Sequence, residues 1–195
     1  VRPTKDLDVF CKAGDFPKIL AYFQERGYRT DVEDERWIAK VWQDDRFFDV
    51  IFAMSNGAAP VTDAWFEDND TIEVYGTQAK ITAPTELVVS KMFIQDRYRY
   101  DGADVVHVLY RQAERIDWKR LLAYMEPYWE VLLIHLLNYR FVYPTERDLI
   151  PRWVMAELTD RLAAQVTLPP ARVKVCRGRM FSPRDYLIDI AEWGF

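Results

Sequence analysis

The spacing of hydrophobic and polar positions changes along the chain and divides it into two parts. Short runs rich in aromatic and β-branched residues predict strands at 7–10, 37–42, 47–52, 71–75 and 78–82. A helix that begins at Asp15 and Pro17 and ends at Gly27 is expected after the first strand. From Pro84 onward the period is helical, which predicts helices at 85–96, 103–115, 118–125, 129–139, 153–164 and 182–191.

These elements predict an α+β fold. A small mixed or antiparallel sheet with flanking helices is expected over residues 1–82, and a helical region over residues 83–195. The run Asp44-Asp45-Arg46 separates two strands as a hairpin-like break. Ser182 is the expected cap of the last helix.

Composition narrows the class of protein. Half of the residues are hydrophobic, so the chain can bury a core, and the formal charge of −5 argues against a protein that coats nucleic acid. The acidic excess falls in the first hundred residues. With only two cysteines and two histidines, a zinc cluster is not expected. The low cysteine content favours a reducing, cytoplasmic setting. No apolar run is long enough to span a membrane, and no signal peptide is visible, so no membrane partner is expected.

Three aspartates carry the strongest chemical signal. Asp6 and Asp8 stand two residues apart on the first strand and therefore point to the same face. Two such carboxylates repel each other unless a cation lies between them, and magnesium prefers oxygen ligands of this kind. Asp49 sits in the middle of an apolar strand, from which it could join the metal site or act as a general base. The alternative is a strand end whose acids face water.

The segment TKDLDVF, a helix, and a strand containing FFDVIF resemble the polymerase-beta-like nucleotidyltransferase superfamily. The likeness is greatest to small bacterial nucleotidyltransferases related to abortive-infection toxins. The resemblance implies that Asp6 and Asp8 bind two magnesium ions and that Asp49 completes the site. It also implies a nucleoside triphosphate as substrate.

A second match lies in Ser90-Lys91-Met92 and the following Arg97–Asp104 segment. It resembles the lysine and Arg-x-x-Asp-x-x-Asp helical motif of the toxin-related members. The resemblance implies that Lys91 contacts nucleotide phosphate and that Asp101 and Asp104 cap or brace the next helix.

Two further residues are expected to bind the nucleotide. Lys5, beside the acids, is placed to neutralise phosphate, with local charge balance as the alternative. Asn56 lies in a Ser-Asn-Gly run whose amides would border the pocket, with an ordinary turn as the alternative. Lys40 is expected to extend to solvent, with projection toward the site as the alternative, and His107 and His135 are expected to be structural.

One feature departs from the family pattern. The superfamily places a Gly-Gly or Gly-Ser turn before the paired acids, whereas the five residues before Asp6 contain no glycine. Because the chain begins with Val1, we expect that a natural N-terminal segment is missing.

The sequence therefore predicts an enzyme that moves a nucleoside monophosphate from a magnesium-bound triphosphate to an acceptor hydroxyl. The acceptor could be a small molecule, tRNA or a protein. The alternative is a non-catalytic module that binds a nucleotide or a partner on the same fold. A metal-dependent phosphohydrolase is a third hypothesis, weakened by the scarcity of histidine.

Overall fold

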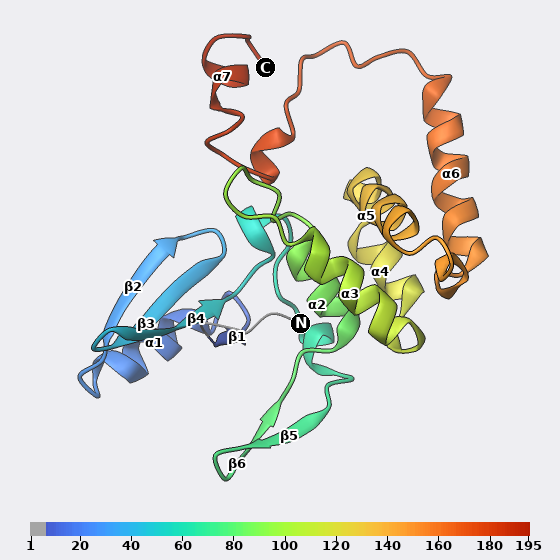
Figure 1. The fold of residues 1–195 in the computed structure, drawn as a ribbon. Coiled ribbons are helices and arrows are strands. Elements are labelled where there is room, and N and C mark those ends of the chain that lie inside the picture. The colour runs from blue at the N-terminus through green and yellow to red at the C-terminus, as the bar shows by residue number, and fades with distance from the viewer. Residues whose placement is uncertain (1–6) are drawn as a thin grey trace. The chain divides into compact units, whose positions relative to one another are not determined.

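The computed structural model describes residues 7–195, which fall into two compact units, Val1–Ala83 and Pro84–Phe195 (Figure 1). The first unit is built on a mixed sheet, and the second is helical. The expected α+β class, with a small sheet, flanking helices and a helical C-terminal region, is confirmed. Lys5 and Asp6 lie outside the described residues.

The four-stranded sheet has the order β1-β4-β3-β2. Its strands are β1 (Asp8–Phe10), β2 (Arg29–Asp34), β3 (Ile38–Gln43) and β4 (Arg46–Ile51). β1 runs parallel to β4, whereas β3 is antiparallel to both of its neighbours. The expected strands at 7–10, 37–42 and 47–52 are present. β2 was not expected, because the run RTDVED has a single apolar side chain.

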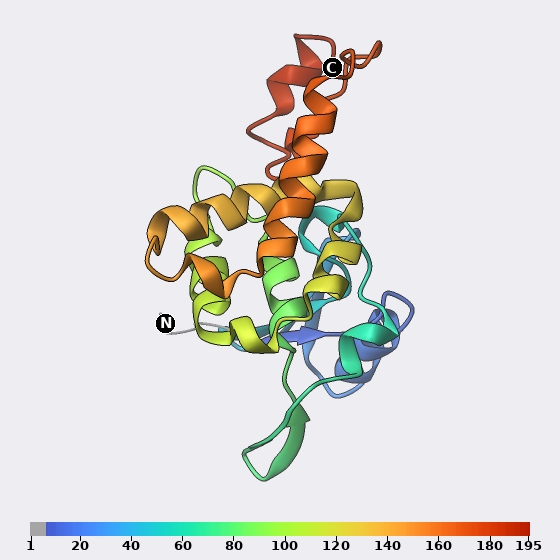
Figure 2. The same ribbon diagram turned by 90° about the vertical axis from the view of Figure 1, so that its right-hand side faces the viewer.

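Two tight hairpins shape the first unit. β3 and β4 are joined through Asp44, whose positive φ of 53° is of the kind that aspartate tolerates. β5 (Thr71–Val74) and β6 (Thr77–Lys80) form a separate two-stranded ribbon that stands apart from the larger sheet (Figure 2). Tyr75 and Gly76 both have positive φ, as a two-residue hairpin turn requires.

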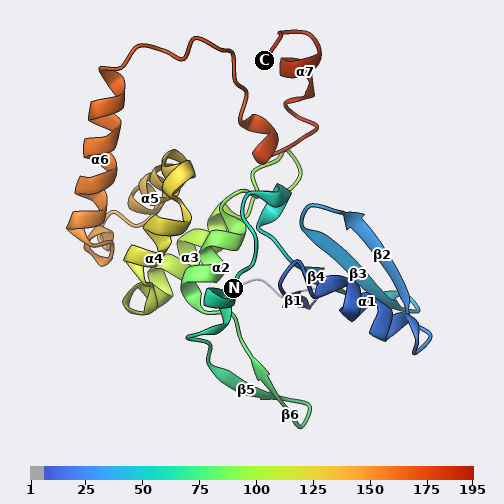
Figure 3. The ribbon, with the colours of Figure 1, turned by 180° about the vertical axis from the view of Figure 1, so that it is seen from behind.

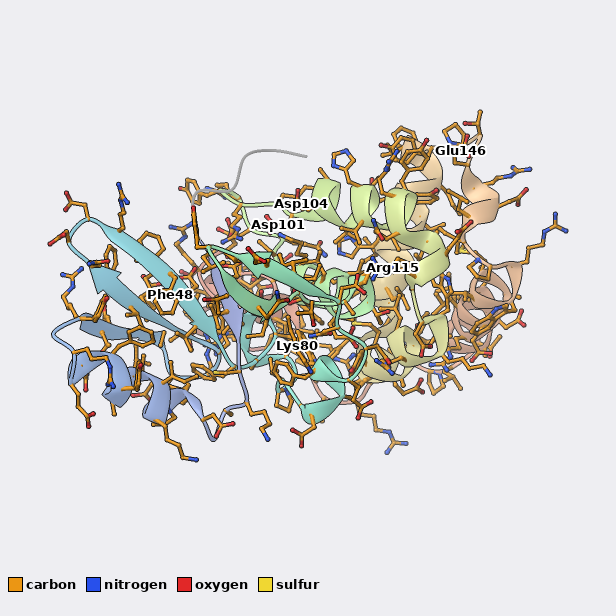
Figure 4. All side chains as sticks on the ribbon, turned by 90° about the horizontal axis from the view of Figure 1, so that it is seen from below. Phe48, Lys80, Asp101, Asp104, Arg115 and Glu146 are labelled. Carbon is orange, nitrogen blue, oxygen red and sulfur yellow. The ribbon has the colours of Figure 1, made fainter. Side chains whose placement is uncertain are left out.

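One face of the larger sheet is covered by α1 (Phe16–Gln24), as Figure 3 shows from behind. The buried core between them comprises Cys11, Leu20, Ala39, Val41, Val50 and Phe52. Phe16 stacks on Phe52 with ring centroids 4.0 Å apart, and Phe48 (Figure 4) meets Phe23 edge-on. Because successive strand residues alternate between faces, Asp8, Lys40 and Asp49 project from the face opposite α1.

The second unit contains six α-helices among its described residues. They are α2 (Pro84–Lys91), α3 (Gly102–Gln112), α4 (Trp118–Tyr124), α5 (Trp129–Val142), α6 (Arg152–Val166) and α7 (Leu187–Ala191). Leu132, Leu136 and Tyr139 of α5 are completely buried, so this helix is central to the unit's core. Other buried residues of this unit include Val88, Val105, Leu109, Leu121, Val154 and Leu158.

Two helix boundaries differ from those expected. α2 ends at Lys91 rather than at Asp96. Asp96 instead belongs to a turn, in which its carboxylate accepts hydrogen bonds from the N–H groups of Tyr98 and Arg99. The last helix begins at Leu187 rather than at Ser182. The hydroxyl of Ser182 accepts a hydrogen bond from the N–H of Asp185, which stabilises a turn before the helix.

Candidate functional site

The parallel pairing of β1 with β4 brings two of the predicted acids together. Asp8 and Asp49 are direct register partners. Partners on neighbouring strands lie about 4.8 Å apart at the backbone, and their side chains share a face. Asp8 is exposed and Asp49 is buried. The strand pairing on which the Asp49 hypothesis depends is therefore present.

Lys40 on β3 is the register partner of Asp49 on its other side. Its ammonium Nζ donates to Oδ1 of Asp49 at 2.6 Å, and the two side chains are only 11% and 10% exposed. The same Nζ lies 3.4 Å from the carboxylate of Glu33 and 4.1 Å from the ring centroid of Phe47. The expectation that Lys40 extends to solvent was wrong. The carboxylate of Asp49 attracts the ammonium, which stays beside it on the sheet.

The charged positions continue across all four strands. Asp31 on β2 is the register partner of Lys40, so Asp8, Asp49, Lys40 and Asp31 form one transverse line, here called the charged row. Glu33 joins it through Lys40. The group thus contains four acids and one lysine, an excess of negative charge that favours binding of a cation.

The hairpin could have revealed Lys40 from sequence alone. Asp44 and Asp45 form the turn, so residues that lie equally far before and after it face each other across β3 and β4. Counting outward from that turn places Lys40 opposite Asp49. Without this counting across the turn, the Lys40–Asp49 pair is missed.

The described donors set limits on a metal site. Within residues 7–195, no three histidine, cysteine, aspartate or glutamate side chains lie close enough together to hold a metal ion. Asp8 and Asp49 supply two adjacent carboxylates. Magnesium is commonly held by one or two carboxylates together with substrate phosphates and water, so this pair fits such an ion.

Lys91 lies in the second unit, where it pairs with the two aspartates of the same motif. Its Nζ is 3.1 Å from Oδ2 of Asp101 and 3.1 Å from Oδ2 of Asp104. Arg99 also contacts Asp101, whose side chain is 2% exposed. Asp101 and Asp104 lie close together at the start of α3 (Figure 4). They anchor the helix to the end of α2.

Asp101 precedes α3, but its side chain does not cap the helix. Its carboxylate instead accepts hydrogen bonds from Lys91 and Arg99. The bracing role expected for the two aspartates therefore has a structural basis, whereas the capping role of Asp101 does not. Contact of Lys91 with a nucleotide stays a prediction.

Asn56 lies in the short 3₁₀ turn Ser55–Gly57, which follows β4 closely. The N–H of Gly57 donates to the carbonyl of Met54, which closes the turn. The turn is thus present as expected, and nucleotide binding by Asn56 and Lys5 stays a prediction.

In the part of the chain that the structure describes, none of the helices has the length and apolarity needed to traverse a bilayer. Comparison of the chain with protein-family models, curated proteins and solved structures yields no match. The resemblance to nucleotidyltransferases thus rests on the sequence motifs.

Proposed function

We propose that the chain is a magnesium-dependent nucleotidyltransferase that moves a nucleoside monophosphate from a triphosphate to an acceptor hydroxyl and releases pyrophosphate. The observation that carries the proposal is the register partnership of Asp8 and Asp49 on the sheet face opposite α1. Two acids far apart in sequence meet there, in the arrangement expected from the motif.

Asp8 and Asp49 would hold the metal, together with Asp6 as the sequence motif implies. Bound magnesium would neutralise negative charge on the phosphates. Lys40 donates a hydrogen bond to Oδ1 of Asp49, while Oδ2 of Asp49 has no hydrogen-bond partner among residues 7–195. Asp49 therefore retains one oxygen for a ligand.

The remaining roles follow the motif. Lys91, Lys5 and Asn56 would contact the nucleotide, and the helical unit would supply the pocket for the acceptor, a small molecule, tRNA or a protein.

Cys11 and Cys176 are both free thiols, which supports a reducing, cytoplasmic setting.

The decisive experiment compares Asp8→Asn with Asp31→Asn. Both variants remove one exposed carboxylate from the charged row, but Asp8 is beside Asp49, whereas Asp31 is two strands away. Titration with magnesium and each nucleoside triphosphate should show binding and pyrophosphate release in the parent and in Asp31→Asn. Asp8→Asn should lose both and remain at least as stable as the parent, because a repulsive pair is relieved. Magnesium-independent binding in the parent, or equal loss in both variants, contradicts the proposal.

The Lys40–Asp49 ion pair favours one alternative. Because Lys40 already neutralises Asp49, the sheet is suited to bind a nucleotide without catalysing its reaction, as in the non-catalytic module. In that case the parent binds a nucleoside triphosphate with magnesium but releases no pyrophosphate. Lys40→Met would then leave pyrophosphate release absent, whereas in an enzyme it would alter the rate.

A further inference from the structure

A concavity lies entirely within the helical unit. It has a volume of about 560 Å³ and is formed by α5, the 3₁₀ turn Arg147–Leu149 and the first half of α6. Glu146, labelled in Figure 4, marks the segment between the two helices. The lining residues are Leu137, Arg140, Arg147, Asp148, Ile150, Arg152, Met155 and Thr159. The volume is in the range of small-molecule sites.

Three arginines on three successive elements line this pocket. Among the described residues, the guanidinium groups of Arg140, Arg147 and Arg152 form no salt bridge or hydrogen bond. Asp148 supplies one opposite charge to the lining, which leaves a formal excess of two positive charges. In a chain with more acids than bases, this local excess is unusual, and the like charges repel one another. A bound dianion would remove that repulsion.

The start of α6 adds to the positive potential. Arg152 is the first residue of this 15-residue helix, and Pro151 at its N-cap makes no side-chain hydrogen bond to the first turn. The N-terminal end of a helix carries a partial positive charge and free N–H groups. The N-terminal end of α6 therefore adds to the positive potential that the arginines create.

The rest of the lining is apolar. Leu137, Ile150 and Met155 contribute hydrocarbon surface, and Leu137 is 50% exposed. A ligand that covered this surface would gain hydrophobic energy in addition to the ion pairs. The pocket thus offers two guanidinium charges beyond its own acid, next to an apolar wall.

We propose that this pocket binds a small phosphate monoester whose phosphate contacts the arginines and whose apolar group covers Leu137 and Met155. Planar guanidinium groups match phosphate oxygens two at a time, and a monoester carries close to two negative charges at neutral pH. This site is independent of the nucleotidyltransferase proposal, because it lies in the other unit and needs no metal.

The test uses phenyl phosphate as the probe, titrated calorimetrically into the full chain in EDTA at low salt. Saturable binding is expected, tighter than that of inorganic phosphate, which lacks the ring, and of phenyl sulfate, which carries one charge fewer. Arg140→Gln and Arg147→Gln should each weaken binding about tenfold or more. Thermal unfolding of each variant checks that the fold is retained.

Arg172→Gln is the matched control. Arg172 is exposed in the same unit, lies outside the pocket lining and loses the same charge on substitution. It should change the affinity less than twofold. Absence of saturable binding, equal weakening by Arg172→Gln, or binding of a short RNA without binding of phenyl phosphate each overturns the proposal. Because EDTA removes magnesium, failure here leaves the Asp8 experiment unaffected.

Discussion

Lys40 and Asp49 form a nearly buried ion pair at adjacent register positions of β3 and β4. The two residues differ in how many charged partners they have. Lys40 also contacts Glu33, whereas Asp49 has Lys40 as its cationic partner among the described residues. Removing one member of a buried pair leaves the other charge uncompensated, which costs far more than the pair itself contributes.

We predict that Lys40→Met lowers the free energy of unfolding by about 3 kcal/mol, because Asp49 loses its partner. Asp49→Asn should cost less, because Lys40 retains Glu33. The double variant should recover much of the loss. Urea unfolding of the four proteins gives the coupling energy. A coupling below about 0.5 kcal/mol would mean that the pair is solvated in solution.

His135 is the most deeply buried histidine of the described chain. Its Nε2 lies 2.9 Å from the carbonyl of Met92, and its Nδ1 has no hydrogen-bond partner. Burial lowers the pKa of His135 from its ordinary 6.5, and the hydrogen bond to Met92 opposes part of that shift. The structural role expected for this residue agrees with its complete burial.

A pH dependence follows for His135. The folded state holds the ring neutral, whereas the unfolded state takes up a proton near pH 6.5. The free energy of unfolding should therefore fall as the pH drops below about 7, by at most about 1.4 kcal/mol per pH unit, until the folded pKa is reached. In His135→Gln the decline between pH 7 and 5 should be smaller. An unchanged slope would assign the decline to other groups.

Among the elements, strands with apolar runs could be predicted and the charged edge strand could not. β3 and β4 contain buried valine, isoleucine and alanine, so their composition alone indicates strands. β2 is stabilised by its hydrogen-bonded ladder with β3, and its exposed acids have low strand propensity. Its charges also suit an edge strand, because they discourage pairing with another chain.

The turn between α1 and β2 depends on glycine. Gly27 has φ of +84°, and a Cβ there would meet no atom within 4 Å. Gly27→Ala should therefore destabilise the chain by about 1 kcal/mol through backbone strain alone. Gly14→Ala is the control, because that site is equally spacious and lacks the positive φ, and it should be neutral or slightly stabilising. Thermal unfolding measures both, and equal effects would refute the strain argument.

At the scale of the whole molecule, the change of period near Pro84 coincides with the boundary between the two compact units. The sequence thus indicates where the architecture changes and which acids could act together. It does not contain the contact of Lys40 with Glu33 or the three-arginine pocket in any local pattern. Those features depend on strand register and on how α5 and α6 turn back on each other.

The two thiols report on different units. Burial raises the pKa of Cys11 to about 11, with Asp15 adding to the effect, and its side chain is 8% exposed in the core beneath α1. Cys176 is partly exposed in the helical unit. An aromatic disulfide reagent at pH 8 should label Cys176 quickly. Cys11 should be labelled only at the rate at which the sheet unit opens. Cys176→Ser should abolish the fast phase of labelling. Rapid labelling of both thiols in the parent would contradict the burial of Cys11.

The charged row has a consequence for folding itself. Its charges stand on four different strands, and on β3 and β4 the charged residue directly precedes a core residue, Lys40 before Val41 and Asp49 before Val50. A strand that paired one residue out of register would turn its charge into the apolar layer beneath α1, at a cost of several kcal/mol. The residues of the charged row, some of which we propose to bind the metal, would therefore also reject misaligned intermediates. Selection for the site and selection for correct assembly would act on the same side chains.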